Sequence, residues 1–252
     1  MKYVEPTKLY QFESVAPVSF PSVGFNSNVL VPATYYANTE NYKYSGPFLM
    51  AQDRGGFKES YVYRRSKVSA IAKNAAIEDI AYSSFETDEI PEGGWDQGGI
   101  FPTAGLSFTG RASCGGTINL MKTLDPNKTY EISFRTKATS MPTLDFLNGS
   151  STNTYQSYGV DDGWKLMKAE FTGKTKARLY CSGEIDELRL LPKGATMQTV
   201  VHDQFANAPL SVCDENGNAV HVEYDALGRK YMTRDQNRNI LEKYSYGINS
   251  LD

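Results

Sequence analysis

The chain has 252 residues, of which 40% are hydrophobic, so it is long enough for one large domain or two modest ones with a packed core. Its net charge is −3, with acidic and basic residues mixed along the chain, and this balance argues against a nucleic-acid partner. Tyrosine (17 residues) outnumbers phenylalanine (12), and Gly, Ser, Thr and Asn are plentiful, so strands that end in tight turns are expected.

Targeting signals are absent from the sequence as printed. No stretch approaches the roughly 20 apolar residues of a membrane-spanning helix, and the opening MKYVEPTKLYQFESVAPV lacks the apolar segment of a signal peptide. We therefore expect no membrane span, and either a cytosolic protein or an internal piece of a longer exported one. The cysteines Cys114, Cys181 and Cys213 form no C-x-x-C pair, which predicts buried thiols rather than a zinc site or a disulfide framework.

Residues 1–79 are irregular and rich in aromatic side chains. The turn sequence DRGG is followed by FKESYVY, which alternates like a strand. After it, apolar residues recur at a spacing that fits a helix between residues 67 and 80, although strands could equally continue through this segment. These apolar residues are Val68, Ile71, Ala72, Ala75 and Ala76.

Residues 80–192 read as many short strands divided by Gly, Pro and Asn. The candidates are LSFTGRA, TINLMKTL, TYEISFRTKA, PTLDFL, WKLMKAEFTG, KARLYCSG and IDELRLLP. Their spacing predicts a β-sandwich or jelly roll. Residues 130–137 alternate strictly, so one face of that strand is expected in the core and the other in water.

Residues 193–252 contain an internal repeat. The pattern Asp-x-Asn-x-Asn begins at Asp214 and again at Asp235, a weaker copy precedes it at Asp203, and the turn ALGR lies between the two clear copies. The unit is a hairpin pair about 21 residues long. Such periods indicate a stacked array, in which each unit buries its face only against its neighbours.

The Asp-x-Asn-x-Asn pattern also begins the calcium loop of an EF-hand. The later positions do not fit, since Ala219 and Ile240 stand where the glycine belongs, and Asp225 and Tyr246 stand at the twelfth position. Asn and Asp favour hairpin turns without a metal, so we read these clusters as turns.

The segment YDALGRK, with the turns DENGN and DQNRN, resembles the tyrosine-aspartate (YD) repeats of RHS proteins. The matching residues are Tyr224, Asp225, Gly228, Arg229, Asp214, Gly217 and Asn218. The pattern departs where Arg238 replaces a glycine and where Ser245 follows Tyr244. Residues 51–86 also resemble segments of the long YD-repeat surface proteins of Bacteroidetes-type bacteria, in which a jelly-roll module often interrupts the array. The resemblance implies a fragment of a longer YD-repeat chain that is secreted or held at the cell surface.

A second resemblance lies within residues 80–192. SSFE, WDQGG, LSFTGRAS, YEISFRTK, WKLMKAEF and IDELRL occur in the order seen in jelly-roll carbohydrate-binding modules. This implies an all-β protein with a jelly roll over 80–192, flanked by YD-type β-hairpin segments over 1–79 and 193–252. It also implies a glycan or polysaccharide partner, and a structural calcium ion that joins Glu86 to Asp186. Ordinary carboxylates at the edge of a sheet are the alternative for these two residues.

Sugar recognition needs exposed aromatic rings for the apolar faces of sugars, and amides or carboxylates for their hydroxyl groups. Trp95, which follows Glu-Gly-Gly, and Tyr155 and Tyr158, which lie in the expected polar loop NGSSTNTYQSYGVDD, are expected to be exposed and are the predicted carbohydrate-binding residues. Surface positions without a function are the alternative. Trp164 alternates with Leu166 and is predicted to pack in the interior.

No catalytic residue is predicted, because His202 and His221 fit strand alternation and no hydrolase or phosphate-binding motif occurs. A glycosidase needs two carboxylates across a cleft, but neighbours such as Asp186 and Glu187 point to opposite faces of a regular strand. The sequence therefore predicts a non-catalytic, glycan-binding surface module. A purely structural spacer of an RHS-type shell or surface array is the alternative, and a glycan-acting enzyme is less favoured.

Overall fold

The computed structural model describes residues 8–12, 36–86, 93–96, 102–104, 107–115, 117–147, 150–203 and 208–247. Within these ranges the secondary structure is almost entirely antiparallel β-sheet, with one short 3-10 turn, η1 (Ile77–Asp79). The all-β prediction is confirmed.

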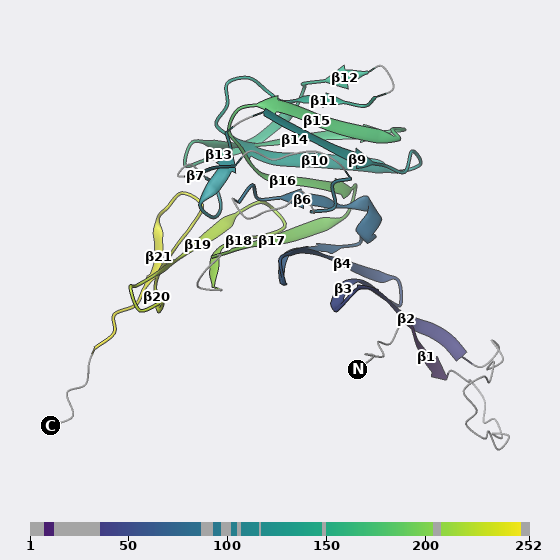
Figure 1. Ribbon diagram of the computed structural model, residues 1–252, viewed down its shortest axis with the longest axis horizontal. Helices are drawn as coiled ribbons and strands as arrows, with labels where there is room; N and C mark the ends of the chain where they lie inside the picture. Colours follow the sequence, from purple (N-terminus) through teal and green to yellow (C-terminus); the bar gives the residue numbers. More distant parts are fainter. Residues whose placement is uncertain are drawn as a thin grey trace.

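The first and last parts of the chain form one ten-stranded sheet, here called the repeat sheet, in the order β1-β2-β3-β4-β5-β17-β18-β19-β20-β21. Its two halves, coloured purple to blue and green to yellow in Figure 1, join where β5 pairs with β17. The strands are β1 (Lys8–Phe12), β2 (Tyr36–Ser45), β3 (Phe48–Arg54), β4 (Phe57–Arg64), β5 (Lys67–Lys73), β17 (Thr196–His202), β18 (Pro209–Cys213), β19 (Ala219–Tyr224), β20 (Lys230–Arg234) and β21 (Ile240–Lys243). Segments far apart in sequence thus build one continuous array of hairpins.

The middle of the chain forms two further sheets, which together make the sandwich. The front sheet has the order β13-β14-β10-β16-β8-β7, with β6 also paired to β16, and the back sheet has the order β12-β11-β15-β9. The strands are β6 (Ala81–Ser83), β7 (Pro102–Ala104), β8 (Ala112–Cys114), β9 (Thr117–Thr123), β10 (Thr129–Thr136), β11 (Thr143–Asp145), β12 (Ser151–Thr152), β13 (Gln156–Asp161), β14 (Trp164–Thr172), β15 (Lys176–Ser182) and β16 (Ile185–Pro192). Because β6 and β16 are neighbours, the chain enters and leaves the sandwich side by side.

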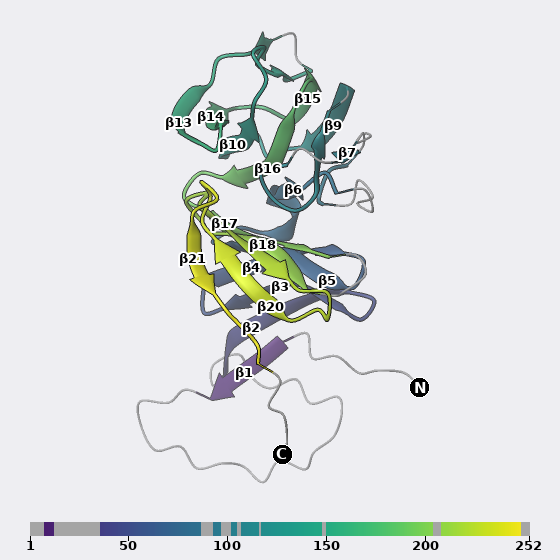
Figure 2. The same cartoon turned by 90° about the vertical axis from the view of Figure 1, so that its left-hand side faces the viewer.

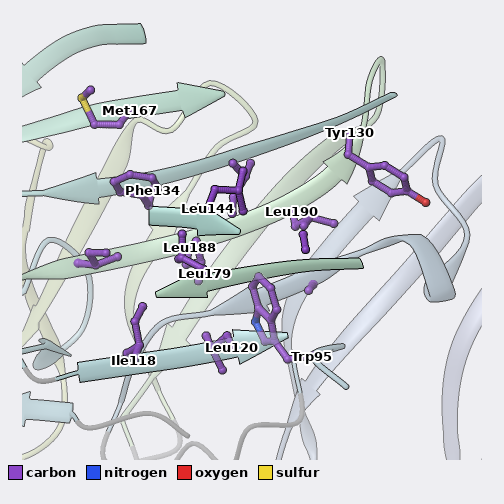
Figure 3. Packing of buried hydrophobic residues seen from close by; sticks show 14 of the residues in the cluster. Trp95, Ile118, Leu120, Tyr130, Phe134, Leu144, Met167, Leu179, Leu188 and Leu190 are labelled. Atoms are coloured by element: carbon purple, nitrogen blue, oxygen red, sulfur yellow. The ribbon is translucent and has the colours of Figure 1, made fainter. Parts of the chain in front are cut away.

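The sandwich has its own hydrophobic core, whose described residues all lie between Ala81 and Leu190. Alternation along β10 and β16 sends Phe134 and Leu188 inward, where they meet Leu144 and Leu179 of the back sheet (Figure 3). The sandwich therefore buries two apolar faces against each other without help from the repeat sheet.

The repeat sheet packs against the outer face of the front sheet, and the two form stacked layers (Figure 2). Phe108 and Trp164 of the sandwich cluster there with Cys213 and Ala219 of the repeat sheet. The guanidinium of Arg135, which is only 2% exposed, donates to the carbonyl oxygen of Gly217 at 2.7 Å. The prediction that the outer face of residues 130–137 meets water is correct only in part: Glu131 and Lys137 are half-buried, whereas Ser133 and Arg135 are buried.

The turns of the repeat are closed by their own aspartates. Oδ1 of Asp214 accepts the backbone N–H groups of Asn216 and Asn218 at 2.9 and 2.8 Å, and Asp225 and Asp235 make the same pair of bonds in the next two turns. Because N–H donors lie where a cation would have to coordinate, these contacts account for the turns without calcium.

Three local expectations differ from the structure. Of the helix and the continued strand that the sequence leaves open between residues 67 and 80, the strand is correct and the helix is wrong: strand β5 pairs on both sides with β4 and β17, and only η1 follows it. In the candidate strand LSFTGRA, residues 107–111 form a loop before β8, and Leu106 lies outside the described residues. The polar segment around Tyr158 contains the edge strand β13. In each case pairing with a distant strand decides the local conformation.

Candidate functional site

A groove of about 390 Å³ lies at the edge of the sandwich, between residues 152–158 and strand β14. Tyr155 and Tyr158, both expected at a sugar site, line it together. Its polar lining comes from Glu131, Gln156, Lys168 and Glu170, and Phe146 and Phe171 add apolar surface. The groove thus combines aromatic rings with hydrogen-bonding groups, which is the lining that small-molecule sites use.

Tyr158 is the exposed aromatic residue of the groove, with 57% of its surface accessible. Its hydroxyl donates to Oε1 of Gln156 at 2.7 Å, and Nζ of Lys168 lies 5.3 Å from the ring centroid. The cation–π contact and the hydrogen bond hold the ring in place on the edge strand β13. The expectation that Tyr158 is exposed is confirmed.

Tyr155 is half-buried and shapes the wall of the groove. Its ring packs edge-to-face on Phe134 of the core, with centroids 5.0 Å apart. The expectation of an exposed Tyr155 is correct only in part, because its ring packs against the sandwich core.

The charged groups of the groove are neutralised within the protein. Lys168 Nζ lies 2.9 Å from Oε1 of Glu131, and Lys193 Nζ lies 2.7 Å from Oε2 of Glu170. Glu131, Lys168 and Glu170 were not selected from the sequence. The signal that could have found them is the alternation in YEISFRTK and WKLMKAEF, which places them on the outer face of adjacent strands.

Trp95 lies apart from the groove and is buried, with 6% of its surface exposed, within the sandwich core (Figure 3). The N–H of Asp96 donates to the carbonyl of Met121, and Nζ of Lys122 donates to the carbonyl of Gly94 at 2.6 Å. These bonds tie the segment to β9 and turn the indole inward. The expectation that Trp95 is exposed is wrong, and its ring offers no platform for a sugar.

Glu86 and Asp186, the predicted calcium ligands, are both buried and hold the same loop. Oε1 of Glu86 accepts the N–H groups of Arg111 and Ala112 at 2.8 and 3.1 Å. Oδ2 of Asp186 accepts those of Phe108 and Thr109 at 2.8 and 2.9 Å. The loop depends on glycine as well, since Gly110 has φ +64° and a Cβ there would lie 2.1 Å from Oε1 of Glu86.

These contacts bear on whether calcium fits. Calcium needs six to eight oxygen ligands with free lone pairs, whereas the oxygens named here already face N–H donors. No group of three or more His, Cys, Asp or Glu side chains within the described ranges is placed to share an ion. The two residues therefore fit carboxylates that accept backbone N–H groups of the loop better than they fit a calcium site, and the effect of a chelator on the melting temperature tests the predicted ion.

Asp186 and Glu187 do not point to opposite faces, because Glu187 has φ +51° and sits at an irregularity in the pairing of β16 with β10. Oε1 of Glu187 accepts hydrogen bonds from the hydroxyls of Tyr82 and Thr109, each at 2.7 Å. Its Oε2 accepts from Arg189 and Thr199 at 3.0 and 2.8 Å. Burial, with the nearby charge of Glu187, raises the pKa of Asp186 well above its usual range. The pair ties β6, β16, β17 and the loop together.

No protein-family model matches the chain, and no curated protein matches its sequence. The geometry of the groove is therefore the main indication of function. Among the described residues there is no helix long and apolar enough to cross a membrane.

Proposed function

We propose that the protein is a non-catalytic module that binds glycans through the groove at the edge of the sandwich. The observation that carries this proposal is that Tyr155 and Tyr158 line one groove together with amide and carboxylate side chains. A sugar ring offers an apolar C–H face, which packs on tyrosine, and hydroxyl groups, which pair with oxygen and nitrogen atoms of side chains.

The groove offers both an aromatic ring for the apolar face of a sugar and side chains that can form hydrogen bonds with its hydroxyl groups. Tyr158 presents the accessible ring, while Gln156 supplies both a donor and an acceptor, and Glu131 and Glu170 supply acceptors. The half-buried Tyr155 is fixed by the core and gives the groove its shape. Because these groups sit on packed strands, little ordering is required when a ligand binds.

We further propose that the module is part of a longer YD-repeat protein that is secreted or displayed at the cell surface. The repeat sheet supports this proposal, because its strands follow each other as hairpins and end in an edge strand, β21, whose four residues are all exposed. An exposed edge can pair with a further hairpin of the same array.

A glycan array followed by titration calorimetry on the intact protein tests the proposal. Tyr158→Ala should keep the fold and weaken binding of any captured glycan at least about tenfold. Tyr180→Ala is the matched control, since Tyr180 has a similar exposure of 52% and lies on β15, outside the groove.

Two results would change the assignment. If plant, fungal and bacterial polysaccharides all fail to bind, the sandwich is a structural spacer. If a bound glycan is turned over, the module is an enzyme.

A further inference from the structure

A second cavity, here called the crevice, adjoins the groove. It has a volume of about 190 Å³ and lies between the outer face of the front sheet and the turn 214–218 of the repeat sheet. Ser133 and Arg189 line it from the sandwich, and Glu215 and Asn216 line it from the turn. Glu131 and Lys168 line both the crevice and the groove, so their ion pair marks the place where the two cavities meet.

One cross-strand row connects the two cavities. Gln156 pairs with Lys168, Lys168 with Ser133, and Ser133 with Arg189, across the four neighbouring strands β13, β14, β10 and β16. Neighbouring strands are about 4.8 Å apart, so the row extends over roughly 14 Å. Gln156 lies at the groove end of this row and Arg189 at the crevice end.

We propose that a glycan chain held in the groove continues along this row into the crevice, so that the YD-type turn 214–218 forms one wall of the binding site. This inference rests on the proposed function and deepens it. It assigns the repeat a direct part in recognition, and it identifies the ligand as an extended oligosaccharide rather than a single sugar.

The charges along the row indicate a neutral ligand. In the crevice Arg135 is paired with Asp161 at 2.7 Å and Arg189 with Glu187 at 3.0 Å. At the rim, Glu215 lies 3.3 Å from Lys73. With the lysine pairs of the groove, each of these cations already has a carboxylate partner, so the row holds no surplus positive charge for a uronate or sulfate group.

Asn216 is the residue of the turn best placed to contact such a chain. It is exposed and lines the crevice, and its side-chain amide offers both a donor and an acceptor. Its backbone N–H is engaged by Asp214 within the turn, so substitution of the side chain leaves that bond in place.

The test is a size series of neutral probes, cello-oligosaccharides and xylo-oligosaccharides from the disaccharide to the hexasaccharide, titrated into the intact protein. Affinity should rise at least about tenfold from disaccharide to hexasaccharide. Asn216→Trp, which fills the mouth of the crevice, should remove that gain and leave disaccharide affinity unchanged. Leu227→Trp is the matched control, because Leu227 occupies the same position in the next turn and is 76% exposed.

Each outcome separates the inference from the proposed function. If the hexasaccharide binds Asn216→Trp as tightly as the unaltered protein, the crevice is not part of the site, and groove binding stands. Suppose that none of the neutral probes binds the unaltered protein, but that another glycan captured on the array needs Tyr158 for binding. The inference of a neutral extended ligand is then overturned, and the proposed function stands. If nothing binds at all, the proposed function and the inference both fail.

A second measurement guards against a misfolded variant. In the unaltered protein, saturation with the hexasaccharide should shift the NMR signal of the Asn216 side-chain amide and slow hydrogen exchange in the turn 214–218. Unchanged signals in that turn, with shifts confined to Tyr158 and Gln156, would overturn the inference.

Discussion

At the scale of single residues, the rings of Trp164, Phe108 and His221 lie buried where the sandwich meets the repeat sheet. Trp164 is 1% exposed and packs at 6.4 Å, centroid to centroid, against Phe108, which in turn lies 6.4 Å from the ring of His221. Among the described residues, neither Nε1 of Trp164 nor Nε2 of His221 has a hydrogen-bond partner. Apolar packing therefore keeps the rings of Trp164 and His221 buried, although a buried polar nitrogen without a hydrogen bond lowers stability.

Trp164→Ala should lower the free energy of unfolding by about 3 to 5 kcal/mol, because it opens a cavity in this interface. Trp164→Phe keeps an aromatic ring and removes the unpartnered N–H, so it should cost less. Denaturant unfolding of both variants checks the order, and equal losses would mean that the indole nitrogen is bonded in solution.

His221 should make stability depend on pH. Burial, assisted by the charge of Arg238, lowers its pKa from 6.5 to about 4, against the opposing charges of Asp162, Asp235 and Glu223. The unfolded chain therefore binds a proton between pH 6.5 and pH 4 while the folded protein does not. Above pH 6.5 the protonation of His221 does not affect the free energy of unfolding. As the pH falls from 6.5 toward 4, the free energy of unfolding decreases by on the order of 3 kcal/mol.

Urea unfolding at a series of pH values, with His221→Gln as the reference, measures this term. The difference in stability between the two proteins should shrink across that window as the pH falls. Parallel pH profiles would show that His221 titrates normally in the folded protein.

At the scale of elements, the turns of the repeat differ according to what they touch. The fourth position adopts positive φ in each of the three turns, as Gly217 (+85°), Gly228 (+75°) and Arg238 (+64°). The arginine accepts a conformation that disfavours side chains, and its guanidinium donates to the carbonyls of Ser107 and Phe108 at 3.3 and 3.4 Å. The departure from the repeat pattern thus coincides with a contact to the sandwich.

Substitution of Asp186, which holds the loop 107–112, tests whether calcium binds there. Asp186→Ala should destabilise the protein by about 2 kcal/mol or more, because the N–H groups of Phe108 and Thr109 lose their acceptor. Asp186→Asn keeps one acceptor oxygen and should cost less. We expect the melting temperature of the unaltered protein to be indifferent to chelator.

A bound ion would give a different result in the same experiment. Calcium at a hundredfold excess over its Kd would add about 2.7 kcal/mol. A chelator-dependent melting temperature, lost in both variants, would restore the predicted ion at Glu86 and Asp186.

At the scale of the whole molecule, the sandwich is an insertion between neighbouring strands of the repeat sheet. Residues 80–192 expressed alone should fold cooperatively, because the described residues of the sandwich core all lie between Ala81 and Leu190. The fragment should be less stable than the intact protein by on the order of 5 kcal/mol, since Phe108, Trp164 and Leu191 lose the repeat sheet that covers them.

Thermal unfolding of the fragment checks this, and Trp164→Ala supplies an internal control. The substitution should cost far less in the fragment than in the intact protein. If the fragment shows no cooperative transition, residues 80–192 are not an independently folding domain.

The sequence by itself determined the features that depend on near neighbours. The alternation of Tyr130, Ile132 and Phe134 specified the inward face of β10, and the aspartates that begin the repeat specified turns, because a carboxylate two to four residues from an N–H closes a hairpin locally. The exposed Tyr158 followed from its polar surroundings in the same way.

Only the tertiary structure decided what covers each face. Alternation separates two faces of a strand, but it cannot say that the turn at Gly217, 82 residues further along the chain, shields the side of Arg135 from water, or that Trp95 turns inward. The same limit applies to the binding site, where Lys168 and Asn216 come from different sheets. Long-range packing brings these groups together, and its free energy depends on surfaces that no local window of sequence contains.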